Sequence, residues 1–116
     1  MFQSCPLLFK HNIILLSDYL RKSLSEGDRC VLLSENRPEW LISDISIMNA
    51  GGVTVPLFTT YSEKDYEYII NDCKPKICIV SNEIQLKKIQ KYISEEIKVL
   101  SIENIHAIII SNTLYI

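Results

Sequence analysis

The side chains best placed to contact a ligand follow the ends of two expected strands. Arg37 comes shortly after the first of these strands. The second is followed by three hydroxyl-bearing residues, Thr59, Thr60 and Tyr61. Ligands of open α/β sheets gather at the carboxyl ends of the strands, so we expect these residues to share one edge of a sheet. For Arg37 we favour a structural alternative, a helix-entry turn held by Asn36 side-chain hydrogen bonds and an Arg37 ion pair.

The histidines and carboxylates do not form a pattern typical of a catalytic or metal site. His11 lies near the start of an expected helix and His106 in an expected turn, and neither has another metal ligand at a typical spacing. Glu35, Glu39 and Asp44 lie in and around the first crossover helix, where Glu39 would interact favourably with the helix dipole. We therefore assign no catalytic, cofactor-binding or metal-binding residue.

Phosphate-binding loops are also missing from the sequence. The chain has three glycines and contains neither GxGxxG nor GxxxxGK[ST], so neither dinucleotide nor P-loop binding is supported. The pair Gly51-Gly52 precedes an expected strand and is better explained as the end of a helix. The tyrosines at positions 61, 66 and 68 lack interleaved basic residues, so we interpret them as packing residues and not as a platform for bases.

Composition argues for an ordinary globular domain. The net charge is −2 and is spread along the chain without a cluster of basic residues, which argues against a nucleic-acid partner. The longest wholly apolar runs fall far short of the roughly 20 residues that a bilayer requires. The start of the chain lacks the basic region of a signal peptide, so we expect a cytoplasmic protein.

Four cysteines occur at positions 5, 30, 73 and 78, and no CxxC pair is present. Cys30 and Cys78 lie inside the two most apolar strand candidates. We expect both to act as small buried hydrophobic residues, and we expect neither a disulfide framework nor a zinc site.

Apolar periodicity predicts alternating strands and helices. The expected helices are 12–25, 38–50, 62–72 and 82–93, and the expected strands are 30–33, 53–57, 76–80, 97–102 and 107–110. This alternation implies right-handed crossovers and a mostly parallel sheet in a three-layer α/β fold. We expect one unit over residues 1–116, with residues 1–10 irregular.

Local signals support several of these boundaries. Pro38 suits the first helical turn, and Ser62 with Asp65 resembles a capping box flanked by a staple of Tyr61 and Tyr66. The segment at 82–85 has the pattern of a capped helix start. In the helix at 38–50 the expected buried face consists of apolar residues at helical spacing together with the lone tryptophan, namely Leu41, Ile42, Ile45, Met48 and Trp40.

The order of residues between about 16 and 81 resembles the start of AMP-forming acyl-CoA synthetases, and bacterial long-chain fatty-acid–CoA ligases in particular. The matching segments are Gly27-Asp28-Arg29, Leu33-Ser34-Glu35-Asn36-Arg37-Pro38-Glu39-Trp40, Ala50-Gly51-Gly52-Val53-Thr54-Val55-Pro56-Leu57, Thr60-Tyr61-Ser62, Tyr68-Ile69-Ile70-Asn71-Asp72 and Ile79-Val80-Ser81.

The resemblance implies part of the N-terminal domain of an adenylate-forming ligase. Complete members use ATP, Mg²⁺ and coenzyme A to activate a carboxylic acid. Their phosphate loop, adenine and ribose contacts, hinge and catalytic lysine lie downstream of the matched segment. The resemblance therefore transfers no site residue to this chain.

Three hypotheses follow from the sequence. The favoured one is an amino-terminal fragment of such a ligase that does not catalyse alone, which would also explain an ending at 111–116 that looks truncated. The second is a non-catalytic α/β module that docks with a complementing ligase chain, associates with itself through an uncovered apolar surface, or binds a small ligand at the strand ends. The third is an independent, flavodoxin-like domain, which the lack of glycine between residues 34 and 37 disfavours.

Overall fold

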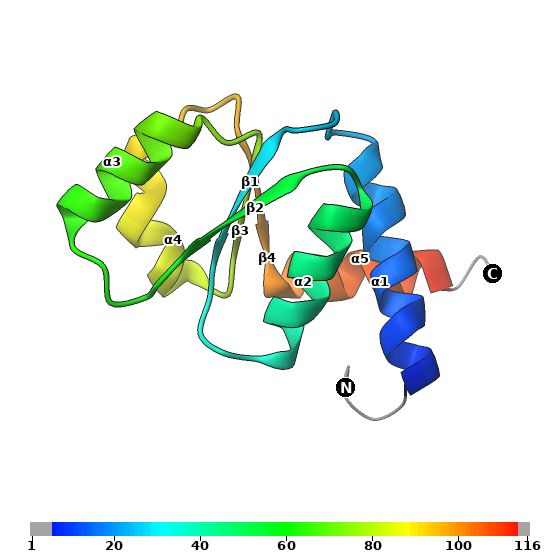
Figure 1. The fold of residues 1–116 in the computed structure, drawn as a ribbon. Coiled ribbons are helices and arrows are strands. Elements are labelled where there is room, and N and C mark those ends of the chain that lie inside the picture. Colours follow the sequence, from blue (N-terminus) through cyan, green and yellow to red (C-terminus); the bar gives the residue numbers. More distant parts are fainter. Residues whose placement is uncertain (1–5, 114–116) are drawn as a thin grey trace.

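A four-stranded parallel sheet forms the middle layer of the fold (Figure 1). The computed structural model describes the backbone of residues 6–113 and the side chains of residues 9–107. The strand order is β2-β1-β3-β4, and the strands span β1 Arg29–Leu33, β2 Val53–Leu57, β3 Ile77–Val80 and β4 Lys98–Ser101. The predicted three-layer parallel α/β fold is confirmed.

Helices cover both faces of this sheet. They span α1 Pro6–Arg21, α2 Pro38–Asn49, α3 Glu63–Cys73, α4 Glu83–Ile89 and α5 Ile102–Thr113, with a 3-10 turn at Gln90–Tyr92. One hydrophobic cluster joins α1, α2 and α5 to one face, and a second joins α3 and α4 to the other (Figure 1). No helix in the described part of the chain is long and apolar enough to cross a membrane.

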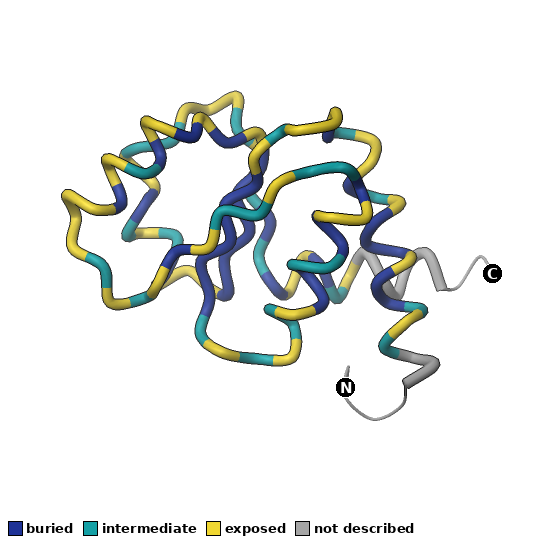
Figure 2. Tube along the Cα trace, in the orientation of Figure 1, coloured by how far each residue is buried: buried dark blue, intermediate teal, exposed yellow. Residues whose placement is uncertain are grey.

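The two central strands are the most deeply buried elements (Figure 2). All residues of β3, and all of β1 except Arg29, are buried, as expected for parallel strands covered on both faces. Cys30 and Cys78 have no exposed surface, which confirms their predicted role as small hydrophobic residues. Burial raises the pKa of Cys78 to about 12, and it raises the pKa of Cys30 as well. Both are free thiols, as is the buried Cys73.

The predicted end of α2 and the predicted capping box of α3 are present. Gly51 adopts a positive φ of 89° just after the end of α2. The Ser62 hydroxyl accepts a hydrogen bond from the Asp65 amide, and the Asp65 carboxylate accepts one from the Ser62 amide. The Tyr61 and Tyr66 rings lie 5.8 Å apart beside this cap, as expected for a staple. These local interactions fix where α2 ends and α3 begins.

Pro56 lies where the edge strand β2 tolerates it. The Val53 amide donates to the Asp28 carbonyl at 2.8 Å, so alternate residues of β2 direct their backbone groups toward β1. Thr54 and Pro56 therefore direct theirs toward the free edge, where the missing N–H of proline costs no ladder hydrogen bond. This proline also makes the edge a poorer template for pairing with another strand.

The predicted fifth strand at residues 107–110 is wrong, because this segment lies within α5. The Ser101 amide donates to Asn104 Oδ1 at 3.0 Å, and the Asn104 amide donates to Ser101 Oγ at 3.2 Å. This reciprocal cap starts the helix directly after β4, and Ile102 and Ile105 enter the core. The helix continues through Thr113, and residues 114–116 lie outside the described part.

The bounds of α1 also differ from the prediction. The helix begins at Pro6 and ends at Arg21, so residues 6–10 are helical and not irregular. Proline has a fixed φ that suits a first helical turn, which accounts for the earlier start. Residues 1–5 of the predicted irregular segment lie outside the described residues.

The buried face of α2 is only partly the predicted one. Ile42 is buried, but Leu41 and Met48 are 47% and 54% exposed, and Ser43 and Ser46 are buried instead. The Ser46 hydroxyl donates to the carbonyl of Ile13 on α1 at 3.3 Å, so small polar residues let the two helices approach closely. An apolar pattern alone could not identify a helix face made partly of serine.

The reciprocal cap of α3 gives a direct test of the fold. We expect Ser62→Ala to lower the free energy of unfolding by about 1 kcal/mol, because the Asp65 amide would lose its acceptor. Chemical denaturation followed by circular dichroism measures this difference. Ser94→Ala is the matched control, since Ser94 is exposed and contributes its backbone carbonyl to a turn. Equal decreases in the free energy of unfolding of the two variants would contradict the capping role.

Candidate functional site

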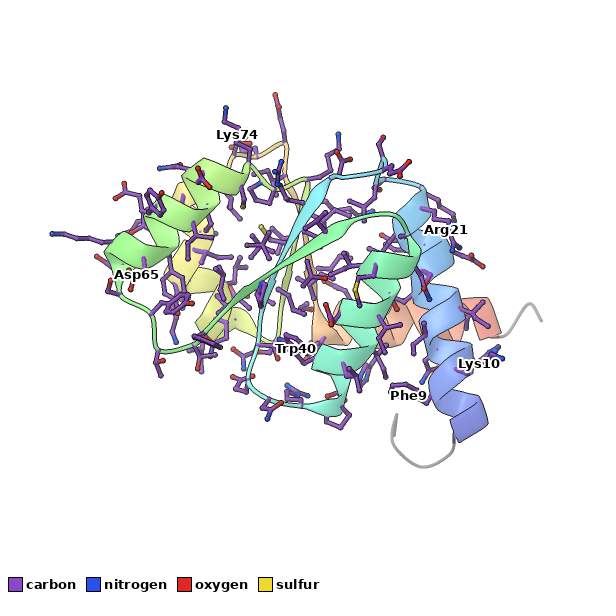
Figure 3. The ribbon with its side chains drawn as sticks, in the orientation of Figure 1. Phe9, Lys10, Arg21, Trp40, Asp65 and Lys74 are labelled. Carbon is purple, nitrogen blue, oxygen red and sulfur yellow. The ribbon has the colours of Figure 1, made fainter. Side chains whose placement is uncertain are left out.

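A shallow hollow lies at the carboxyl ends of β1 and β2, beside the first turn of α2. Its volume is about 440 Å³. Trp40, in the first turn of α2, marks its place in Figure 3. The lining residues are Ser34, Glu35, Asn36, Trp40, Pro56, Leu57, Phe58, Thr59 and Thr60. The edge of the sheet predicted to gather ligands therefore carries the hollow.

The hollow includes some of the predicted residues and leaves others out. Thr59 and Thr60 line it, whereas Arg37 and Tyr61 do not. The Tyr61 ring packs 5.1 Å from the Phe58 ring and also against Tyr66, so it serves the staple of α3. The structure thus brings the two threonines to the end of β1 and gives the tyrosine a packing role.

The ion pair, which is one of the two interactions of the structural alternative for Arg37, is present. Arg37 Nε donates to Glu39 Oε1 at 3.1 Å in the helix-entry turn. Arg37 itself occupies the cap position of α2 in an extended conformation, without a side-chain cap hydrogen bond. Asn36 lines the hollow. Two features hold the turn. They are the ion pair between Arg37 and Glu39 and the proline Pro38 in the first turn of α2.

Glu39 lies in the first turn of α2, as predicted, and its side chain is only 12% exposed. In addition to Arg37 it approaches His106, whose Nε2 lies 3.8 Å from Glu39 Oε2. His106 belongs to α5, so its predicted position in a turn was wrong. The contact connects the start of α2 to α5 and supports a structural role for both residues.

The contact between Glu35 and Gln85 was not predicted. Gln85 Nε2 donates to Glu35 Oε2 at 3.0 Å, joining the end of β1 to the first turn of α4. The backbone amide of Gln85 also donates to Oδ1 of Asn82, which caps α4, and this local role was visible in the sequence. The contact with Glu35, 50 positions away, depends on strands β1 and β3 being neighbours. No local sequence signal could have shown it.

Glu35 is held as a carboxylate. The Ser81 side chain lowers the pKa of Glu35 most, although the geometry between the two groups falls short of a well-formed hydrogen bond. The backbone amide of Glu35, the Gln85 side chain and the charge of Arg37 lower this pKa further, and burial opposes them. Glu35 Oε1 and Gln85 Oε1 are both covered and lack a well-formed hydrogen bond. The carboxylate is therefore charged but incompletely compensated.

The loop after β2 is fixed from the other side. Lys88 on α4 donates from Nζ to the Thr59 carbonyl at 2.7 Å. The Tyr66 hydroxyl donates to the Phe58 carbonyl at 2.6 Å. These two contacts hold the loop that forms one wall of the hollow.

The chemistry available at this edge is limited. Glu35 is the only charged residue among those lining the hollow. No group of three or more His, Cys, Asp or Glu residues that could hold a metal ion occurs among the described residues. His11 lies on α1 and does not line the hollow. The arrangement can bind a polar or cationic group, and its lining residues offer no nucleophile paired with a base.

The pKa of Glu35 gives a pH-dependent prediction. Its pKa in the folded chain lies below the ordinary glutamate value of about 4.3, so it stabilises the fold above that pH, and this stabilisation is lost as the pH falls through the folded pKa. We expect Ser81→Ala to raise the Glu35 pKa, because the largest cause of the shift is removed. NMR titration of the side-chain carboxyl carbon measures it. Ser94→Ala is the control, and an unchanged Glu35 pKa in Ser81→Ala would refute this assignment.

Several known proteins are relatives of this chain. The model of the family described as AMP-binding enzyme matches residues 11–111. The long-chain-fatty-acid–CoA ligase ACSBG1 of Rattus norvegicus is 33% identical over 73 residues, which cover 63% of this chain and 10% of the ligase. The matched part of the chain therefore spans about a tenth of the length of that curated relative.

Solved structures show the same fold. The crystal structure of VinN matches with a TM-score of 0.78 at 20% identity, over 88% of this chain and 27% of that one. The N-terminal subdomain of Klebsiella oxytoca NpsA matches with a TM-score of 0.68 at 19% identity, over 89% of this chain and 24% of that one. The four-stranded parallel sheet with its helices thus has the fold of part of the NpsA N-terminal subdomain. From the family match over most of its length, the chain belongs to the AMP-binding enzyme family.

Proposed function

We propose that this chain is the N-terminal scaffold portion of an ATP-dependent, AMP-forming fatty-acid–CoA ligase and does not catalyse by itself. The observation that carries the proposal is the family match over residues 11–111, combined with a long-chain-fatty-acid–CoA ligase of which the aligned segment covers only 10%. The part of the fold represented here is a sheet with its covering helices. Its role in this proposal is to support the portion of the ligase that performs the chemistry.

The hollow at the strand ends does not fit ATP. Adenylyl transfer requires cations and hydrogen-bond donors placed around a triphosphate. The only charged lining residue is Glu35, whose carboxylate would repel both a triphosphate and the carboxylate of a fatty acid. Lys88 and Arg37 are engaged by the Thr59 carbonyl and the Glu39 carboxylate. No step of the ligase reaction is therefore assigned to these residues.

A second candidate function is a non-catalytic α/β module that requires a partner chain. The observation favouring it is the exposure of large apolar side chains on α2 and on the edge strand. Leu41 and Met48 on α2 are about half exposed, and so is Val53 on β2. Exposed apolar side chains favour association when they form a contiguous patch. A complementing ligase chain or a second copy would cover them.

Ligand-dependent unfolding tests the scaffold proposal. We expect the melting temperature of the 116-residue chain to stay unchanged with ATP–Mg²⁺, coenzyme A or a fatty acid, because a ligand stabilises a fold only if it binds the folded state. We also expect no AMP release above the level without protein. Differential scanning fluorimetry and an AMP assay measure the two quantities. A rise in melting temperature with ATP–Mg²⁺, or AMP formed in proportion to the protein, would overturn the proposal.

Self-association tests the second candidate. For a module that pairs with a second copy we expect concentration-dependent association, which Leu41→Glu combined with Met48→Glu reduces, since charges on these exposed positions oppose their burial. Sedimentation velocity measures it. Lys64→Glu is the control, because Lys64 is an exposed residue of α3, which packs on the opposite face of the sheet. A monomer at all concentrations would contradict self-association through these residues.

A further inference from the structure

We propose that the hollow beside Trp40 is a subsite for an organic cation, namely a guanidinium or ammonium group carried on an apolar stem. The proposal is based on the walls, the charge and the volume of the hollow. It does not depend on the scaffold proposal, because it concerns binding at residues present in this chain.

The apolar walls suit the stem of such a ligand. Trp40, Pro56 and Phe58 line the hollow together, and Phe58 is 65% exposed. The Phe58 ring makes an edge-to-face contact with the Tyr61 ring at 5.1 Å, so it has a packing partner although it faces solvent. Aromatic faces attract cations, and tryptophan binds ammonium and guanidinium groups best. The half-buried Trp40 and the exposed Phe58 thus provide two aromatic walls for a cation.

The charge of the residues that line the hollow is negative. Glu35 supplies it, and Gln85 donates to one of the two carboxylate oxygens. The other oxygen is covered without a well-formed hydrogen bond. Gln85 is only 6% exposed, and its own Oε1 also lacks a donor. Gln85 itself does not line the hollow, so the negative charge that a bound cation would compensate is that of Glu35 alone.

The basic side chains around the hollow compensate Glu35 only in part. Arg37 is the weakest of the influences that lower the Glu35 pKa, and its Nε is bound to Glu39 Oε1 at 3.1 Å. Lys88 Nζ is bound to the Thr59 carbonyl at 2.7 Å. Neither residue lines the hollow. Among the described residues that line the hollow, Glu35 is therefore the only one that carries a charge.

Two sources could supply the same chemistry, a free small amine and an arginine or lysine side chain of another polypeptide segment. A volume of about 440 Å³ lies within the range of small-molecule sites, roughly 300 to 1,000 Å³. Glu35 disfavours anions, which distinguishes this subsite from one for a carboxylate or a nucleotide.

Fluorescence of Trp40 provides the measurement, because it is the only tryptophan in the chain. We expect saturable changes on titration with n-butylguanidinium and n-butylammonium, and none with n-butyrate, at matched ionic strength. A blocked Gly-Arg-Gly peptide tests the second source. Saturation by both the free cations and the peptide would indicate a subsite open to side chains, and saturation by the free cations alone would indicate a small-molecule subsite. Both outcomes support the proposal.

Variants decide whether Glu35 is responsible. We expect Glu35→Gln to weaken the apparent affinity for n-butylguanidinium by about tenfold or more, since a charge-assisted contact is replaced by a neutral one. Glu96→Gln removes an equal charge from an exposed position outside the hollow and should leave the affinity unchanged. A thermal unfolding curve for each variant confirms that it is folded.

Chemical-shift changes of the Gln85 side-chain amide give a second readout, which does not depend on tryptophan emission. We expect n-butylguanidinium to shift this amide in the unmodified chain, because Gln85 is hydrogen-bonded to Glu35. The proposal is overturned by the absence of saturation with both cations, by equal responses to n-butyrate, or by identical affinities of Glu35→Gln and Glu96→Gln.

Discussion

The parallel pairing of β1 with β3 is the interaction on which the rest of the structure depends. These strands lie in the middle of the sheet, and almost all of their side chains are buried on one face or the other. Each buried Val, Leu or Ile side chain contributes roughly 1.5 to 3 kcal/mol relative to its exposed state. The burial requires helices on both sides, so α1, α2 and α5 cover one face and α3 and α4 cover the other. Elements far apart in the sequence are joined through this pair of strands.

The same pairing creates the carboxyl edge at which the hollow lies. Because β1 and β3 are neighbours, the segment after β1 meets the helix after β3, and Glu35 meets Gln85. The loop after β2 is then held from α4 by Lys88. Three connections thus converge on one place, and the polar groups there are close without being fully paired. A hollow at this edge is a consequence of the topology and needs no specialised loop.

Membership of the AMP-binding enzyme family and the properties of the edge lead to different conclusions about function. The family match covers residues 11–111. The hollow contains a single negative charge and aromatic walls, which is the opposite of a site for a triphosphate. A fold shared with an enzyme does not by itself bring the enzyme's chemistry, because the reacting groups belong to particular side chains. The chemistry of this edge therefore has to be argued from the residues that line it.

Local signals in the sequence determined the four strands, the end of α2 shortly before Gly51 and the reciprocal cap of Ser62 with Asp65. The start of α5 was missed although its cap is equally local, because four consecutive apolar residues suit a buried strand as well as a helix. Chain order and parallel pairing were enough to place Thr59 at the edge. Only the tertiary structure decided the Glu35–Gln85 contact and the serine-containing face of α2. The physical reason is that turns and caps join near neighbours and are encoded directly, whereas contacts 50 residues apart exist only after the sheet has selected its strand order.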